Sequence, residues 1–284
     1  MISILSDDVP VSFLCGHFSV SRSGYYAWIR RDFSPRAAIQ KKHVELVKEG
    51  FRESRKRYGS PRLSISLKAK GISICENTVA KIMKNEGLVA RKKKNFKVVK
   101  LNEETKSDAH ERVFKIEEEK ALEVNEVWAG DITYLPVDNK FIYLSVVMDL
   151  KRRKLVGWSL DKSLSSEGVI KALKDASRKE GETGKVFHSD QGVQYKSLAF
   201  RKLLSDNKIQ GSMSRKGNCY DNAFVETFFK SFKSELFWNQ SFESEEHLIS
   251  EITEYIEIWY NKKRIHTSLD NKSPLEYELG INAA

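Results

Sequence analysis

Three carboxylates in this chain occupy positions at which they could act together. Asp131 lies inside the apolar run VWAGDITYL, and Asp190 follows the apolar stretch KVFHS at a glycine-containing turn. Glu226 lies in a segment with helical periodicity. Hard divalent cations such as Mg²⁺ or Mn²⁺ take oxygen ligands, so converging acids suit them better than His or Cys. Two such ions about 3.5–4 Å apart can activate a water or a 3′-hydroxyl and stabilise the leaving oxygen of a phosphodiester. The predicted chemistry is therefore metal-dependent cleavage or transfer at a phosphodiester.

Each acid taken alone also has a structural explanation. Asp190 could cap a turn, Asp131 could form a buried pair, and Glu226 could be an ordinary surface residue. The 35 residues between Asp190 and Glu226 leave room for a helix, a short strand and a returning loop. The prediction of a joint site therefore depends on the elements that carry the three acids.

The pattern from residue 127 to residue 240 predicts an α/β catalytic core. Strands are expected at Val127–Val137, Phe141–Leu150, Lys154–Leu160, Lys185–Ser189 and Ile209–Ser214, with helices at Ser166–Lys179, Tyr195–Asn207 and Phe224–Phe237. This order is that of the ribonuclease-H-like fold, a mixed five-stranded sheet with helices. Asp131 would lie on its central strand and Asp190 at the end of the neighbouring strand. The helix that bears Glu226 could pack across the ends of both.

The expected Glu226 helix has two different faces. Its apolar face is formed by Val225, Phe228, Phe229, Phe232 and Leu236. Glu226, Lys230 and Lys233 lie away from that stripe. Seven positions advance a helix by nearly two full turns, so Lys233 should project from the same face as Glu226, about 10 Å further along. We expect Lys230 and Lys233 to contact DNA, with Lys233 meeting a phosphate near the scissile bond. The alternative is a solvated lysine that pairs with Glu226.

Charge is distributed unevenly along the chain. Residues 1–100 carry 22 Lys and Arg against 8 Asp and Glu, a balance of +14, whereas the remainder sums to −4. A basic first third joined to a slightly acidic remainder indicates a nucleic-acid-binding region attached to a different module. The alternative is a well-solvated basic surface. Residues 1–100 are therefore predicted to form a helical DNA-binding region.

Within this region, residues from about 62 to 88 have the pattern of a helix-turn-helix. Gly71 permits the sharp turn, and Ser73 stands three before Glu76 as in a capping box. Val79, Ile82 and Met83 would face inward, which leaves polar residues on the outer face of the second helix. The predicted DNA contacts are Asn77, Thr78, Lys81 and Lys84 on that face, followed by Arg91, Lys92, Lys93 and Lys94 in a phosphate-contacting tail.

The remaining segments set the domain limits and the compartment. Residues 101–126 are acidic and carry no strong strand signal, so they are predicted to be a linker. Residues 241–284 are expected to form a C-terminal helical extension. No apolar run approaches the length of a membrane helix, the first residues make a poor signal peptide, and the three cysteines are scattered. We therefore expect a cytoplasmic protein with reduced thiols and no membrane partner.

Together these motifs resemble bacterial insertion-sequence transposases of the DDE transposase and retroviral integrase superfamily. The resemblance covers nearly the whole chain and includes SRSGYYAW, RYGSPRL, NTVAKIMKNEGL, VWAGDITYL, HSDQGVQY, SRKGNCYDNAFVETFFKSFKSEL and YNKKRIHTSLDNKSPLEY. It is closest in kind to the second-reading-frame product of elements whose full transposase is a two-frame fusion. The chain departs from the family pattern just before Trp128, where Glu123, Val124 and Asn125 stand and a proline is usual.

The resemblance implies a reaction and a set of roles. Asp131, Asp190 and Glu226 would be the catalytic triad and the metal ligands, with Mg²⁺ or Mn²⁺ as cofactor, as two ions. The implied reaction frees the 3′-hydroxyls at the ends of the element and joins them to target DNA by transesterification. The implied partners are double-stranded DNA of the terminal repeats and of the target, further copies of the chain in the DNA complex, and an upstream-frame transposase product. Such a protein would associate with the nucleoid when bound to DNA.

Two other interpretations stay open. Another nuclease of the ribonuclease H fold, such as a resolvase, would explain the acids but would leave the helix-turn-helix and the basic arm without a function. A DNA-binding regulator, or a decayed remnant, would use the first third alone. The intact triad argues against the second alternative.

Overall fold

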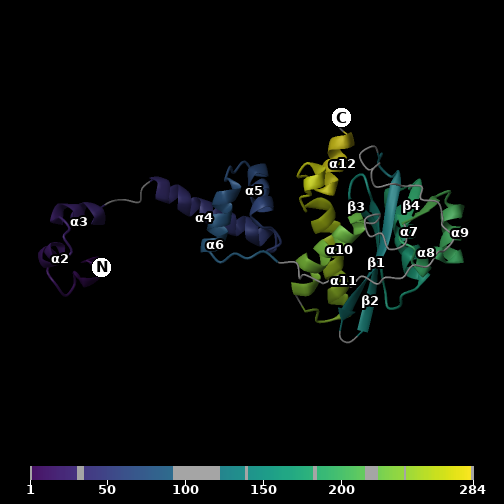
Figure 1. Ribbon diagram of the computed structural model, residues 1–284, viewed down its shortest axis with the longest axis horizontal. Coiled ribbons are helices and arrows are strands. Elements are labelled where there is room, and N and C mark those ends of the chain that lie inside the picture. Colours follow the sequence, from purple (N-terminus) through teal and green to yellow (C-terminus); the bar gives the residue numbers. More distant parts are fainter. Residues whose placement is uncertain are drawn as a thin grey trace. The chain divides into compact units, whose positions relative to one another are not determined.

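The computed structural model describes residues 2–30, 35–91, 122–137, 140–181, 184–214, 223–239 and 241–282. The chain divides into two compact units, Met1–Val89 and Ala90–Ala284 (Figure 1). Lys92, Lys93 and Lys94 of the predicted basic tail, and most of the predicted linker, lie outside the described residues. Within the described residues, no helix is both long and apolar enough to cross a membrane.

The first unit is entirely helical. It contains α1 (Ile2–Leu5), α2 (Val11–His17), α3 (Arg22–Ile29), α4 (Pro35–Glu53), α5 (Ser60–Ala69) and α6 (Glu76–Asn85). Ser21 caps the start of α3, because its hydroxyl accepts a hydrogen bond from the Gly24 backbone. Tyr25 of α3 is buried, whereas Trp28 is exposed.

Helices α4, α5 and α6 pack around one apolar core. Val47 of α4, Leu63 of α5 and Val79 of α6 are completely buried there. Helices α4 and α5 approach closely because Gly50 has no side chain: an added Cβ would lie 2.9 Å from the Leu63 Cδ1 atom. Gly71 takes φ of 78° between α5 and α6, a backbone conformation that glycine adopts without strain. The predicted helix-turn-helix is therefore present.

The predicted capping box at the start of α6 is wrong. Helix α6 begins one residue after Cys75, and no side chain caps its first turn by a hydrogen bond to the backbone. Instead the Cys75 Sγ atom lies 3.1 Å from the Thr78 Oγ1 atom. The backbone places Cys75 rather than Ser73 at the N-cap, so the spacing between Ser73 and Glu76 no longer matches the motif.

The second unit is built on a five-stranded sheet in the order β3-β2-β1-β4-β5. The strands are β1 (Val127–Val137), β2 (Lys140–Asp149), β3 (Lys154–Asp161), β4 (Val186–Ser189) and β5 (Gln210–Met213). Strand β2 is antiparallel to both β1 and β3, whereas β4 runs parallel to β1 and β5 runs parallel to β4. The predicted ribonuclease-H-like sheet is confirmed, with β1 at its centre.

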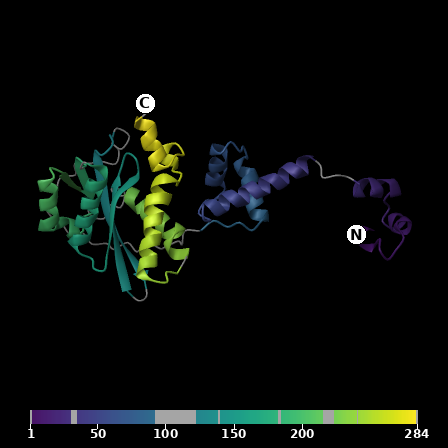
Figure 2. The same ribbon diagram turned by 180° about the vertical axis from the view of Figure 1, so that it is seen from behind.

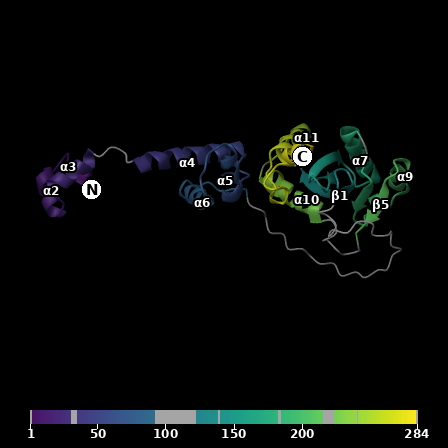
Figure 3. The ribbon, with the colours of Figure 1, turned by 90° about the horizontal axis from the view of Figure 1, so that it is seen from above.

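Helices cover both faces of this sheet (Figures 2 and 3). One face carries α7 (Ser166–Glu180), α8 (Val193–Lys196) and α9 (Leu198–Asp206). The other carries α10 (Ala223–Glu235), α11 (Glu245–Thr253) and α12 (Pro274–Asn282). Helix α7 packs closely against β3 at Gly157. An added Cβ at this position would stand 2.2 Å from the Ala172 carbonyl oxygen, so the close approach depends on glycine.

The helix predicted at Tyr195–Asn207 is two helices, α8 and α9. Ser197 breaks it with an extended ψ of 144°, and its hydroxyl accepts a hydrogen bond from the Phe200 backbone to cap α9. The periodic sequence pattern does not reveal this break, because Tyr195, Phe200 and Leu204 are all buried in the core on this face.

The C-terminal segment is packed into the second unit. After α10 come a 3₁₀ turn (Phe237–Asn239), α11, a π-helical segment (Glu254–Tyr260) and a short 3₁₀ turn (Thr267–Leu269) before α12. The buried Glu235 carboxylate of α10 accepts hydrogen bonds from Tyr255, Trp259 and Arg264. These bonds join the end of α10 to the helical extension.

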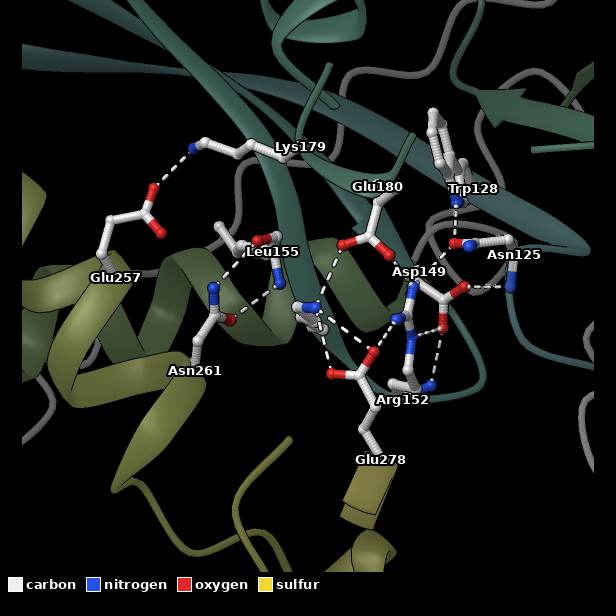
Figure 4. A network of polar contacts seen from close by, with 11 residues as sticks. Asn125, Trp128, Asp149, Arg152, Leu155, Lys179, Glu180, Glu257, Asn261 and Glu278 are labelled. Atoms are coloured by element: carbon white, nitrogen blue, oxygen red, sulfur yellow. Dashed lines mark hydrogen bonds and ion pairs between the residues drawn. The ribbon is translucent and has the colours of Figure 1, made fainter. Parts of the chain in front are cut away.

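A second buried network surrounds Arg152 in the turn between β2 and β3 (Figure 4). Its guanidinium pairs with Asp149, Glu180 and Glu278, and Glu278 belongs to α12. Lys154 also pairs with Glu180 and Glu278, each at 3.0 Å. Arg152 belongs to the basic stretch KRRK at residues 151–154, yet it is only 1% exposed.

Asn125 completes the network at the point where the sequence departs from the family pattern. Its side-chain oxygen accepts hydrogen bonds from the Trp128 indole at 3.0 Å and from Arg152 at 2.6 Å. Its backbone φ is 56°, which proline cannot adopt. Asn125 therefore connects the start of β1 to the Arg152 network (Figure 4).

Candidate active site

Asp131 lies on β1, and Asp190 directly follows β4, the parallel strand next to β1. The pairing of β1 with β4 ends at Ala129 and His188, and Asp131 and Asp190 each lie two residues further along the chain. Alternate residues of a strand point to the same face, so Asp131 lies on the face of β1 that Ala129 occupies, and Asp190 follows directly after the end of β4. His188 is buried and hydrogen bonds to Ser212 and Ser214 of the β5 edge, which fixes the end of β4.

The two aspartates are held differently. Asp131 is half-buried, and its Oδ1 atom accepts a hydrogen bond from the Ile132 backbone at 2.8 Å. Asp190 is exposed, and its Oδ1 atom accepts one from the Gly192 backbone at 2.9 Å. Asp190 thus caps the turn into α8, which is the structural role considered for it from the sequence. In both side chains Oδ2 makes no hydrogen bond within the described residues.

The pKa of Asp131 shows that the carboxylates of Asp190 and Glu226 lie near it. The pKa of Asp131 is raised to about 7, first by burial and next by the negative charge of Asp190. Glu226 raises this pKa further, whereas the Ile132 backbone and Lys233 lower it. Three carboxylates are therefore close enough to repel one another, and the nearby lysine only partly offsets this repulsion.

Glu226 and its two lysines lie on α10, which packs against β1. Glu226 is half-buried and forms an ion pair with Lys230 at 3.5 Å. The half-buried Lys233 ammonium lies 4.9 Å from the centre of the Tyr134 ring. Burial lowers the pKa of Lys233, while Asp131 raises it. Glu226 pairs with Lys230 and not with Lys233. The alternative in which Lys233 is a solvated lysine paired with Glu226 is therefore not what the structure shows.

Tyr195 of α8 is a further member of this site, although the sequence pattern predicts it only as the start of a helix. Its ring packs against Phe187 and Phe200, and its hydroxyl is buried with no hydrogen-bond partner among the described residues. Burial raises the pKa of this hydroxyl well above its ordinary value, and Asp131 and Asp190 raise it further. The position five residues after Asp190, inside HSDQGVQY, is the signal that could have identified it.

These residues fit a divalent cation. Among the described residues, no three His, Cys, Asp or Glu side chains are already arranged to hold one ion. Residues 215–222, which directly precede α10, lie outside that set. The donors are nevertheless of the right chemistry, because carboxylate oxygens are the ligands that Mg²⁺ takes. A buried hydroxyl without a partner beside two mutually repelling carboxylates marks a place where positive charge and bound water would be stabilised.

A pocket of about 200 Å³ opens beside the two aspartates. It is lined by Asp131, Ile132, Tyr134, Tyr143, Leu164, Asp190, Gln194 and Tyr195. Glu226 does not line this pocket. The pocket therefore lies on the side of the aspartates toward α8 and the β1–β2 hairpin.

The predicted DNA-contacting residues of the first unit lie mostly on an open face. Asn77, Lys81 and Lys84 are exposed on α6, opposite the buried side chains of that helix. Thr78 is half-buried and contacts Cys75. Arg91, by contrast, belongs to the second unit, where its guanidinium donates a hydrogen bond to the Glu235 carbonyl oxygen.

Comparison with known proteins accounts for most of the chain. Residues 121–219 and 226–279 each match an integrase core domain, and residues 39–96 match an HTH-like domain. This combination, together with the sheet and the acids described above, defines a DDE-type polynucleotidyl transferase that binds DNA. Such an enzyme uses a divalent metal ion.

Within the DDE-type polynucleotidyl transferases, the chain is similar to transposases of insertion sequences. The chain is 35% identical to the transposase InsF for insertion sequence IS3A of Escherichia coli K12, over 95% of this chain and 94% of that protein. It is 38% identical to the transposase for insertion sequence element IS904 of Lactococcus lactis, over 82% of this chain and 92% of that protein. The chain belongs to this family of insertion-sequence transposases.

A solved structure shows a more distant likeness. A chain from the simian T-cell lymphotropic virus intasome is 17% identical, with a TM-score of 0.45. The match covers 75% of this chain and 69% of that chain.

Proposed function

We propose that this transposase cuts the ends of its own insertion sequence and joins the freed 3′-hydroxyls to target DNA, with Asp131, Asp190 and Glu226 as catalytic metal ligands. The observation that carries the assignment of the three acids is their convergence on one point. Asp190 and Glu226 both raise the pKa of Asp131, although 35 residues and a helix-strand-loop segment separate them in sequence. Carboxylates that repel one another destabilise the fold, and such clusters are typical of functional sites.

The three acids would hold two Mg²⁺ or Mn²⁺ ions. When bound, these ions would supply an activated water or hydroxyl on one side of the phosphodiester and charge stabilisation on the other. Of the chain's own residues, Asp131 presents its free Oδ2 atom from a rigid central strand. Glu226 must part from Lys230, which leaves that lysine free for DNA. Because Lys230 is exposed and the pair is 3.5 Å long, parting costs less than about 1 kcal/mol.

DNA recognition is assigned to the basic first unit. Asn77, Thr78, Lys81 and Lys84 of α6 would read the terminal repeats, and the basic tail that follows the first unit, Arg91, Lys92, Lys93 and Lys94, would contact phosphates. Lys230 and Lys233 would contact the DNA next to the acids. Synapsis of two ends requires at least two copies of the chain on DNA, and an upstream-frame product is a further proposed partner.

The experiment that tests the assignment compares four variants on a labelled duplex carrying the end of the element. Asp131→Asn, Asp190→Asn and Glu226→Gln should each reduce strand cleavage in Mg²⁺ to background while DNA binding stays close to wild type. Asp206→Asn is the matched control, because Asp206 is an exposed aspartate on α9 outside the site. Cleavage at the wild-type rate by any of the first three variants would remove that residue from the site.

The same assay separates the alternatives. A resolvase would prefer branched DNA to the linear end, and a ribonuclease H would need an RNA–DNA hybrid. A non-catalytic regulator would bind the end and cut none of the three substrates in Mg²⁺.

A further inference from the structure

The pocket beside the aspartates has one acidic side and an otherwise largely uncharged lining. Asp131 and Asp190 stand at one side of it, and Tyr134, Tyr143 and Leu164 line much of the rest. Tyr134 and Tyr143 are register partners on β1 and β2, so their rings rise from adjacent strands. The pocket is therefore a slot bounded by tyrosines that opens directly onto the proposed metal site.

Tyr134 is unusually placed for a residue this close to a reaction centre. It lies three residues beyond Asp131 on the same strand, roughly 10 Å along it, and 60% of the residue is exposed. Lys233 lies over its ring, and Phe141 meets the ring edge-on at 5.7 Å between centres. Leu164, on the pocket wall, is 52% exposed. Exposed apolar side chains around a slot indicate a surface that a ligand covers.

The chemistry of the slot restricts what can enter it. An anionic group is disfavoured, because Asp131 and Asp190 form one side and no basic residue lines the pocket within the described chain. The volume of about 200 Å³ is below that of pockets for drug-sized ligands, so the occupant is about the size of one ring system. The phosphate of such a ligand has a place outside the slot, at Lys233 and at the metal site. The occupant must therefore be uncharged, about the size of one ring system, and attached to a phosphate that stays outside the slot. A neutral, planar group attached to a phosphodiester satisfies these three conditions.

We propose that the slot receives one nucleobase, unstacked from the DNA end next to the scissile phosphate, and that Tyr134 is its stacking platform. This inference rests on the proposed function, because it requires the scissile phosphate to lie at Asp131 and Asp190. Enzymes that modify a base extrude its nucleotide from the duplex, which shows that protein contacts can offset the cost of unstacking one base. Stacking on an aromatic side chain offsets the lost base stacking and accepts any base. Gln194 and Tyr143 both line the slot and carry polar groups that can hydrogen bond to the edge of a base.

Photo-crosslinking tests the contact directly. Duplexes carrying the terminal repeat would bear 5-iodouracil at single positions within two nucleotides of the scissile phosphate, and they would be irradiated with the full chain in the absence of divalent metal. The expected result is a crosslink at one of these positions that maps to Tyr134. It should persist in Phe141→Ala, a control that removes the neighbouring exposed ring outside the pocket. A crosslink pattern that avoids Tyr134 and Tyr143 at every position would overturn the proposal.

Cleavage of the same duplexes in Mg²⁺ supplies the second measurement. Tyr134→Ala should slow cleavage of the paired end about tenfold, whereas Tyr134→Phe and Phe141→Ala should stay within about twofold of wild type. A mismatch that unpairs the base beforehand should restore most of the rate of Tyr134→Ala. Equal losses on paired and mismatched ends would contradict the proposal. Wild-type protein that cuts neither end would overturn the proposed function instead.

Discussion

The acids around Arg152 and the acids proposed to bind metal belong to the same compact unit, yet their charges are balanced in different ways. Asp149, Glu180 and Glu278 meet two cations of the chain, Arg152 and Lys154. The pKa of Glu180 is lowered, because the attraction of Arg152 and Lys154 exceeds the opposing effect of burial. Asp131 shows the opposite shift, with its pKa raised by burial and by two other carboxylates.

The direction of these shifts distinguishes a structural cluster from a binding site. Around Arg152 the chain supplies its own counter-charge and completes the cluster during folding. At Asp131 and Asp190 no ion pair with a base exists among the described residues, and a nearby buried hydroxyl is left without a partner. The chain thus leaves the second cluster to be neutralised from outside, which is the property expected of a metal site.

The largest stability effect should come from the self-neutralised cluster. Asp149→Asn leaves the shape of the side chain but removes the charge that faces the buried Arg152 guanidinium. Because breaking one partner of a buried pair leaves an uncompensated charge, the free energy of unfolding should fall by about 3–5 kcal/mol in urea titrations. Glu167→Gln is the control, since its pair with Lys171 is exposed and should contribute less than about 1 kcal/mol. Similar small losses in both variants would contradict the difference between the clusters.

The same substitution at Asp131 should raise stability in protein freed of divalent metal. The folded pKa of about 7 exceeds the ordinary aspartate value of 3.8, so the folded chain keeps a proton that the unfolded chain releases in this range. Wild-type stability should therefore fall as pH rises from about 4 to 7, and at pH 8 the ionised carboxylate costs roughly 2–4 kcal/mol. Asp131→Asn should lose this pH dependence and unfold at higher urea at pH 8. Identical pH profiles for both proteins would count against the repulsion at Asp131.

The smallest expected change in stability concerns the hydroxyl oxygen of Tyr195. Tyr195→Phe keeps the ring against Phe187 and Phe200 but removes the buried hydroxyl. Without metal, the variant should be as stable as wild type or more stable by about 1 kcal/mol, because an unsatisfied buried group is lost. The increase in melting temperature on adding Mg²⁺ should be smaller in Tyr195→Phe than in wild type, if the hydroxyl supports bound water at the site. A hydroxyl with only a packing function would leave the Mg²⁺ response unchanged.

The sequence predicts the parts of the fold that arise from local patterns. Strand order, the central place of Asp131 and the position of Asp190 at the end of the neighbouring strand follow from apolar periodicity and the order of the elements. The apolar stripe of α10 likewise predicts its packing, since Val225, Phe228 and Phe232 are all buried. These features depend on side chains close together in sequence, which a periodic pattern records.

The features that the sequence does not reveal depend on distant partners. The burial of Arg152 requires Glu180 and Glu278, which are 28 and 126 residues away. Arg91 lies in a basic run that predicts DNA contact, yet its hydrogen bond goes to Glu235, 144 residues away. The orphaned hydroxyl of Tyr195 likewise becomes visible only once α8 is placed beside Asp131 and Asp190. Neither burial nor an absent partner can be read from spacing alone.

The contact between Glu278 and Arg152 also affects the order in which the protein becomes complete. Residues are added from the N-terminus, so Glu278 is synthesised 126 residues after the arginine it neutralises. A nascent chain can assemble all five strands while this guanidinium still lacks one of its carboxylates. The support beneath the sheet is finished only when α12 leaves the ribosome. A chain whose translation stops before α12 would keep the pairs of Arg152 with Asp149 and Glu180 but would lack the pair with Glu278.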